Sequence, residues 1–158
     1  MEFRKVIETR QAVRAYRKDP VPEAALQRIR EAVQIAPTGM NRQPFKVLFV
    51  RNAAMRKEIA EKACHQEFIA EAPMLCVVCC EKGEDFNAAI ATDHLVLAAT
   101  DEGLATCWVG WFERDVMAQV VPVPQGMEPC ILVPLGYGAE TPERKPRKSL
   151  EEITAILD

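Results

Sequence analysis

One predicted helix limits what this chain can fold into. Residues 88–99 read AAIATDHLVLAA and are apolar on nearly all sides. A helix of this kind has to be enclosed by other elements all round. A chain of 158 residues forms one domain of ordinary size, which offers little interior for such a helix. We therefore expect a homodimer in which a second copy buries this helix within a large apolar interface.

Helical and strand-like patterns alternate along the rest of the chain. Helical spacing of apolar residues, together with start and stop signals, predicts helices over about 2–9, 20–36, 53–68, 85–103, 113–120 and 149–157. In the last of these, Ser149 and Glu152 form a capping box. Short apolar runs predict strands over 45–50, 74–80, 106–112 and 130–138, and Pro134 indicates an edge strand or a bulge in the last one. This order predicts a helix-covered α+β or α/β sheet in a single domain, residues 1–158.

Composition excludes several functional classes. A net charge of −3 argues against a general nucleic-acid binder, which needs an excess of basic charge on one face. The longest apolar runs, such as PMLCVVCC, are much shorter than the roughly 20 residues of a membrane span, and the first ten residues lack the apolar region of a signal peptide. Four of the six cysteines lie in apolar runs typical of buried strands. We expect a cytoplasmic protein without a disulfide framework.

Basic residues gather near the two ends of the chain. Arg10, Arg14, Arg17 and Lys18 form one group, and the ERKPRK run at 143–148 forms the other. If residues 10–16 are extended, Arg10, Ala12, Arg14 and Tyr16 share one face, with the two arginines about 13 Å apart. Guanidinium groups match the oxygens of a phosphate, which favours a small anion held between the groups. Solvated surface charge is the more frequent role of such runs, and the pattern alone does not choose between the two.

Two further segments carry groups suited to a ligand. The loop APTGMNRQPF, residues 36–45, contains Thr38, Asn41 and Gln43, whose donors and acceptors suit the edge of a planar heterocycle. The same side chains could instead bond their own backbone in a turn. In GLATCWVGWF, residues 103–112, Gly110 indicates a close approach by a ligand or another backbone, while Trp108 and Trp111 are typical of a core or an interface.

The sequence signal for metal ligands is weaker. The CVVCC segment has a CxxC spacing, but in a strand Cys76 and Cys80 face one way and Cys79 the other, unlike the loops of zinc or redox motifs. His65 and His94 are each isolated on predicted helices. We therefore expect the cysteines to serve core packing and the histidines to be surface or core residues, and we predict no metal site.

Taken together, the motifs R-x-A-V-R, APTGMNRQPF, the Asp-containing apolar helix, GLATCWVG, LGYG and RKPRKSLEEI resemble the nitroreductase family of FMN-dependent oxidoreductases. The resemblance follows the sequence order over nearly the whole chain. It implies an α+β three-layer sandwich, with a mixed, mainly antiparallel sheet flanked by helices. It also implies an intertwined homodimer that holds FMN at shared active sites.

The resemblance also implies roles for particular residues. The cofactor-binding residues would be Arg10, Gln11, Ala12 and Arg14 at the phosphate, Thr38, Asn41 and Gln43 along the isoalloxazine, Val109, Gly110 and Trp111 near flavin N5, and Arg147 with Lys148 or Lys145 closing over the phosphate. The family usually has serine at the position of Ala12 and often arginine at that of Gln11. Losing one neutral hydrogen bond weakens binding by about 0.5–1.5 kcal/mol, so FMN binding should survive the change at Ala12.

The implied activity transfers hydride from NADH or NADPH through flavin N5 to an electron-poor acceptor, a nitroaromatic, a quinone or an enone. In such enzymes the cofactor carries the chemistry, and no side chain need act as a catalytic acid. Two alternatives stay open. One is a flavin-binding sensor or storage protein without turnover, and the other is a cysteine-rich metal protein built on CVVCC.

Overall fold

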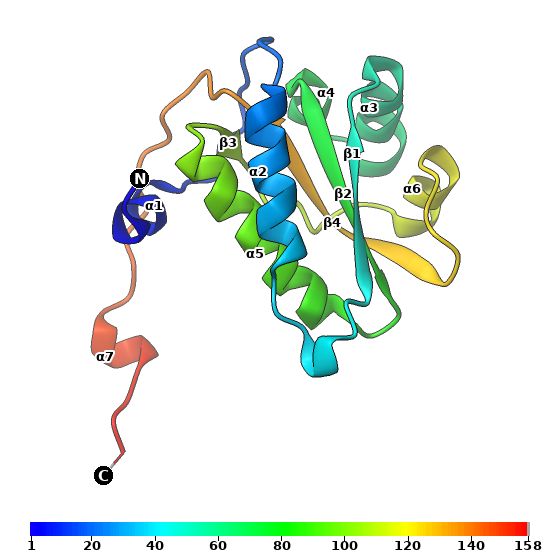
Figure 1. Cartoon of the computed structure of the whole chain (residues 1–158). Helices are drawn as coiled ribbons and strands as arrows, with labels where there is room; N and C mark the ends of the chain where they lie inside the picture. The colour runs from blue at the N-terminus through cyan, green and yellow to red at the C-terminus, as the bar shows by residue number, and fades with distance from the viewer. Residues whose placement is uncertain (158) are drawn as a thin grey trace.

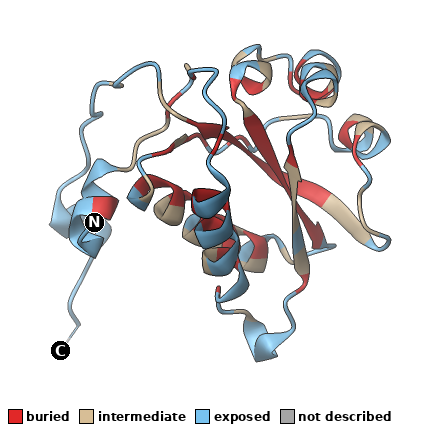
Figure 2. Ribbon diagram, turned by 45° about the horizontal axis from the view of Figure 1, so that its top comes forward, coloured by how far each residue is buried: buried red, intermediate tan, exposed pale blue. Residues whose placement is uncertain are grey.

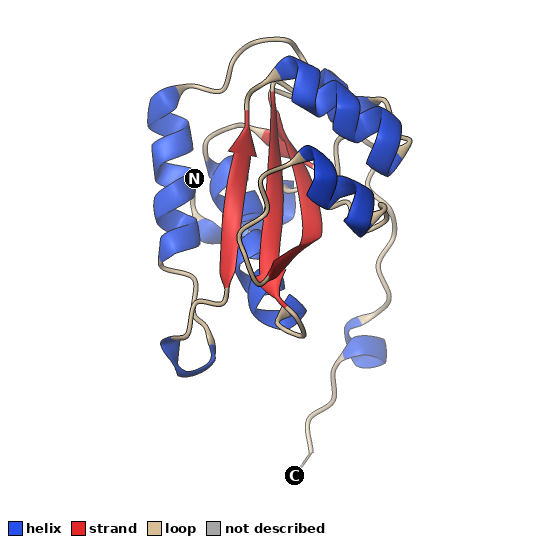
Figure 3. Cartoon of the chain, turned by 90° about the vertical axis from the view of Figure 1, so that its right-hand side faces the viewer, coloured by secondary structure: helices blue, strands red, loops and turns tan. Residues whose placement is uncertain are grey.

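A four-stranded antiparallel sheet forms the middle layer of the computed structural model, which describes residues 1–157 (Figure 1). The strands lie in the order β1-β2-β4-β3. Their bounds are β1 Phe45–Val50, β2 Met74–Glu81, β4 Met127–Gly136 and β3 Ala105–Thr106. Helices cover both faces of this sheet, which confirms the predicted α+β three-layer fold (Figure 3).

Strand β2 lies at the centre of the core, and its alternate side chains enter two different layers. Met74, Cys76, Val78 and Cys80 pack in the cluster that contains helices α2 (Glu23–Gln34) and α5 (Asp85–Asp101). Leu75, Val77 and Cys79 pack on the other face, which is covered by α3 (Ala53–Ile59) and α6 (Arg114–Val120). All seven residues from 74 to 80 are buried (Figure 2). Burial on both faces explains why this strand reads as a continuous apolar run.

The helices follow the apolar spacing of the sequence. Helix α2 buries Leu26, Ile29 and Val33, which recur at three- and four-residue intervals as in an amphipathic helix. Helix α1 (Phe3–Thr9) buries Val6 alone. The C-terminal helix α7 (Leu150–Ile153) begins with the capping box that the sequence predicts.

The helix predicted over 53–68 is interrupted, so this prediction was wrong in its length. Helix α3 passes into a π-helical turn, η2 (Ala60–Cys64), and His65 then adopts a left-handed backbone with φ 52°. A separate short helix, α4 (Phe68–Glu71), follows. Ile59, Ala60, Ala63 and Cys64 are all buried against the sheet, so tertiary packing determines a break that neither glycine nor proline marks.

The strand predicted over 106–112 is also shorter than expected. Only Ala105 and Thr106 pair with β4 as a strand, and Val109 forms one isolated bridge to Leu132. The interpretation of Pro134 was wrong, since β4 is an inner strand and its bulge lies at Cys130, between the pairs Val78↔Ile131 and Cys79↔Pro129. The backbone of Pro134 faces the β3 side beyond the two β3 pairs, where its carbonyl accepts from the Tyr16 hydroxyl at 3.4 Å. No described strand pairs with Pro134 on that side, so its missing N–H leaves no strand hydrogen bond unmade.

Helix α5 is only partly enclosed by its own chain. Ala88, Ala91, Leu95 and Ala99 are buried against α2 and the sheet. Ile90 and Leu97 are half-buried, and Phe86 is 78% exposed. One chain therefore covers one side of this apolar helix and leaves the other side partly open.

The C-terminal segment runs away from the body of the molecule (Figure 1). It exposes four large apolar side chains, namely Leu150, Ile153, Ile156 and Leu157. Of the helices that the structure describes, none has the length and apolar character needed to cross a membrane.

Candidate functional site

The first basic segment is held in place by backbone pairing on both sides. Val13 N donates to Thr106 O at 3.0 Å, and Ala12 and Thr106 form a parallel bridge at the β3 edge. On the other side, Arg17 N donates to Tyr137 O and Ala139 N donates to Ala15 O, both at 2.8 Å. The residues that follow β4 therefore return alongside the N-terminal segment.

The predicted alternation of this segment holds only in part. Arg14 is exposed, but Tyr16 is buried together with Val13, and its hydroxyl donates to Val13 O at 2.7 Å. Burial raises the pKa of Tyr16 far above its ordinary value. Tyr16 thus faces the core, because the segment changes direction where it crosses from β3 to residues 137–139.

This pairing brings Arg10 and Arg14 of the first basic group and part of the second group to one pocket of about 360 Å³, the arginine pocket. Arg17 of the first group instead pairs with Asp19 at 2.8 Å. The pocket lies between residues 7–14 and 142–147, whose ribbons run side by side near α1 (Figure 1). The cations that line it are Arg10, Arg14, Arg144, Lys145 and Arg147. Gln11 and Ala12 are also in the lining, whereas Lys148 is not.

The cations of this pocket have no carboxylate partner among residues 1–157. Elsewhere in the chain arginines pair with carboxylates, for example Arg42 with Glu84 at 2.8 Å. Two carboxylates line the pocket, but Glu8 pairs with Arg4, and Glu143 forms no ion pair within the described chain. The result is a pocket with excess positive charge and several guanidinium forks, a donor set that fits a phosphate group.

Arg144 was not among the predicted site residues, although it belongs to the predicted basic run. Sequence spacing does not tell which residues of an ERKPRK run turn toward a pocket, since the run has no regular secondary structure. The four basic residues between positions 144 and 148 were the signal that pointed to the segment as a whole.

The loop from Pro37 to Pro44 uses its polar groups locally. Gln43 N donates to the Thr38 hydroxyl at 3.0 Å, and the Gln43 side chain donates to Asn41 Oδ1 at 3.2 Å. Met40, Asn41 and Gln43 have φ values of 50°, 54° and 51°. A non-glycine residue in this region costs on the order of 1–3 kcal/mol, and such conformations cluster at functional sites. The turn chemistry considered as an alternative is therefore present, in a strained loop outside the lining of the arginine pocket.

The third predicted segment lies at the β3 edge. Val109 is buried and exchanges two backbone hydrogen bonds of 2.9 Å with Leu132. Gly110 is exposed, and a Cβ added there would meet nothing within 4 Å. The close approach predicted at Gly110 is thus not made by its own chain. Trp111 is 76% exposed, which is unusual for a large aromatic side chain.

The cysteines behave as core residues. All six are free and buried, and burial raises the pKa of Cys79 to about 11 and that of Cys64 to about 12. Cys76 and Cys80 face one layer and Cys79 the other, as predicted. Cys80, Cys130 and Asp85 hold donor atoms within 4.8 Å of one another, but Asp85 is paired with Arg114 at 3.3 Å. Only Cys80 of the CVVCC segment takes part in this group.

The isolated histidines also have local partners. His65 Nε2 lies 3.1 Å from a carboxylate oxygen of Glu113, and His94 Nδ1 lies 3.0 Å from the Ile90 carbonyl. Each ring therefore has a polar partner within its own chain.

Comparison with known proteins gives concordant matches. A family model described as "Putative TM nitroreductase" matches residues 2–158. A protein of Methanothermobacter thermautotrophicus named "Putative NADH dehydrogenase/NAD(P)H nitroreductase" is 29% identical, with 90% of this chain and 80% of that protein covered. An "FMN reductase [NAD(P)H]" of Bacillus subtilis is 26% identical over 96% of this chain and 72% of its own length.

A solved structure of similar shape adds to these matches. It is a nitroreductase family protein of Clostridium difficile, which is 28% identical and superposes with a TM-score of 0.87 over 98% of both chains.

Proposed function

Because this chain belongs to the nitroreductase family, we propose that it is an FMN-dependent oxidoreductase that uses NADH or NADPH to reduce an electron-poor acceptor. Nitroaromatics, quinones and enones are the acceptor classes that we propose. When bound, FMN would supply the hydride chemistry at its N5, and the residues of this chain would bind and orient it.

The pocket of unpaired cations is the observation that carries this proposal. Arg10 and Arg14 from one end of the chain and Arg147 from the other line the same space, without carboxylate partners in the described chain. We propose that they bind the FMN phosphate, with Gln11 and Ala12 beside it and Arg144, Lys145 and Lys148 adding positive charge. Because Ala12 offers no hydroxyl, the guanidinium groups would carry more of the phosphate contact than in a relative with serine there.

We further propose that the flavin ring lies against Thr38, Asn41 and Gln43 and against Val109, Gly110 and Trp111. Neither group lines the arginine pocket, so the ring site would need a second copy to complete it. The open space at Gly110 and the exposed Trp111 leave room for a ring or a partner at this edge. Backbone N–H groups near Gly110 would then orient the ring and stabilise negative charge on it, without a catalytic acid.

Exposed apolar surface supports a homodimer. The open side of α5 and the apolar residues of the C-terminal segment would both be buried by a second copy. The six free thiols support a cytoplasmic location, which belongs to the same proposal.

The spectrum of the purified protein tests this function. We expect a yellow protein with stoichiometric FMN, whose absorbance bleaches under anaerobic NADH or NADPH and returns when a quinone or nitroaromatic is added. A yellow protein that does not bleach with either nucleotide would instead identify a flavin-binding sensor or storage module. A protein that contains metal and no flavin would favour the cysteine-based alternative.

A further inference from the structure

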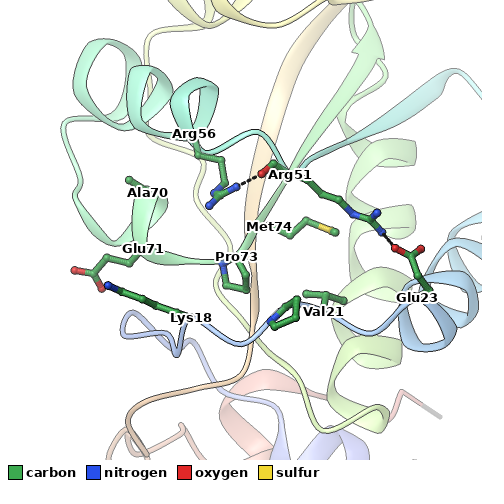
Figure 4. A pocket seen from close by; sticks show the side chains of 10 residues that line it. Lys18, Val21, Glu23, Arg51, Arg56, Ala70, Glu71, Pro73 and Met74 are labelled. Atoms are coloured by element: carbon green, nitrogen blue, oxygen red, sulfur yellow. Dashed lines mark hydrogen bonds and ion pairs between the residues drawn. The ribbon is translucent and has the colours of Figure 1, made fainter.

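A second pocket lies apart from the arginine pocket. It has a volume of about 530 Å³ and shares no lining residue with the pocket of residues 7–14 and 142–147. Its walls come from the chain before α2, the end of β1, α3, α4 and the start of β2 (Figure 4). Much of this wall is apolar, formed by Val21, Ala70, Pro73 and Met74.

Arg56 of α3 enters this pocket as a buried charge without a carboxylate partner. Its side chain is only 8% exposed, and its Nη1 donates to the carbonyl of Arg51. Its Nε is buried and has no hydrogen-bond partner among residues 1–157. Figure 4 shows the guanidinium directed from α3 toward Pro73 and Met74. Arginine is almost never buried unless it is paired, so this side chain calls for an anion.

Two more cations line the pocket, and they determine how much charge a ligand can bring. Arg51 is paired with Glu23, while Lys18 forms no ion pair within the described chain. Glu71 is the second carboxylate of the lining. Three cations and two carboxylates leave a net charge of +1, which matches one negative charge and disfavours a dianion such as a phosphate monoester.

Burial also makes the charged form of Arg56 less stable unless an anion lies beside it. Removal from water lowers the pKa of its guanidinium, so the unliganded state holds a charge at a cost. A bound carboxylate would accept from the guanidinium group of Arg56, and Lys18, which is exposed, would contact it from the outer side.

We propose that this pocket binds a small monocarboxylate with an apolar body, held by Arg56 and Lys18 at the carboxylate and by Val21, Ala70, Pro73 and Met74 around the body. The site is separate from the proposed flavin site and stands whether or not that proposal is right.

Titration calorimetry on the protein as isolated tests this binding, with 3-bromobenzoate as the probe and 3-bromobenzamide as its neutral match. We expect the acid to bind and the amide to bind at least tenfold more weakly, because the amide cannot accept charge-assisted hydrogen bonds as a carboxylate does. In crystals soaked with the acid, the bromine anomalous signal should lie in the pocket of Figure 4.

Two variants locate the contact. Arg56→Gln should abolish detectable binding, and Lys18→Ala should weaken it about tenfold. Lys57→Ala is the matched control, since Lys57 lies on the outer face of α3 and pairs with Glu61 at 3.6 Å. If Arg56→Gln fails to fold, the Lys18→Ala variant still tests the proposal, because Lys18 is exposed. Equal affinity of Lys18→Ala and the wild-type protein, equal binding of the amide, or bromine found only outside this pocket would overturn the proposal.

Discussion

We propose that Arg10 and Arg14 bind phosphate because their side chains have no carboxylate partner in the part of the chain that the structure describes. Both lie in a chain rich in acidic residues, yet neither forms an ion pair within the part of the chain that the structure describes. Arg14 uses its backbone N–H, which donates to Glu140 Oε1 at 2.6 Å, and leaves its side chain unpaired. A guanidinium in this situation is available to a ligand.

Replacing Arg14 with glutamate tests that availability. A negative charge in place of a phosphate partner should weaken FMN binding at least tenfold, so that the protein is isolated largely colourless. Flavin absorbance per protomer and calorimetry on the flavin-free protein measure the effect. Arg30→Glu, an exposed change on α2, is the control and should keep its flavin. Stoichiometric flavin in Arg14→Glu would remove Arg14 from the site.

The buried thiols make a prediction about pH. Burial raises the pKa of Cys79 to about 11 and of Cys64 to about 12, above the ordinary value of about 8.5. The folded state thus favours the neutral thiol, and its stabilisation is complete below pH 8.5 and declines as pH rises above that value. We expect the melting temperature to fall above pH 9.

At pH 8, a thiol reagent such as dithionitrobenzoate should leave all six cysteines of the folded protein unmodified and should react with six after unfolding. Rapid labelling of the folded protein would contradict this account.

At the scale of elements, strand β4 shows how close packing constrains one backbone position. A Cβ at Gly136 would lie 2.7 Å from Cγ of Pro73 and closer still to its Cδ. Pro73 directly precedes β2, and its ring cannot rotate away. Only glycine fits at this point of the sheet.

Gly136→Ala should therefore destabilise the protein by about 1–3 kcal/mol, the usual cost of overpacking. Urea unfolding at a matched protein concentration measures the change. Gly39→Ala is the comparison, since a Cβ at Gly39 would meet nothing within 4 Å. Equal midpoints for the two variants would show that Pro73 shifts without cost.

Elements with one clear periodicity were predicted well, and elements determined by contacts were not. Strand β1 has the predicted bounds, and α2 and α5 differ from prediction by only a few residues at their ends. The π-helical turn at 60–64 and the short β3 were missed, because each depends on neighbours that are distant in sequence. Local propensity cannot report those neighbours.

At the scale of the whole molecule, several large apolar side chains are exposed. Leu150 and Ile153 are 66% and 64% exposed on a helix that buries no residue of its own. Together with the open side of α5, this surface is our reason to propose a homodimer whose C-terminal segments pack on the partner.

Leu150→Asp and Ile153→Asp should each weaken the dimer, because a charge buried in an apolar interface is costly. Analytical ultracentrifugation measures the change, and loss of flavin should accompany dissociation if the flavin site is shared. Ala24→Asp introduces the same charge at an exposed position of α2, outside the proposed interface, and should leave the dimer intact. A wild-type protein that is monomeric at all concentrations would end this proposal.

The sequence by itself determined a helix-covered sheet, the apolar strand at its centre and the two basic groups, since each depends on a local pattern of side chains. Only the tertiary structure decided that the two groups meet, because backbone pairing of residues 12–17 with Thr106 and with 137–139 joins opposite ends of the chain. It also decided which charges stay unpaired, Arg56 among them, because pairing and desolvation depend on neighbours in space. A sequence pattern does not show which residues are neighbours in space.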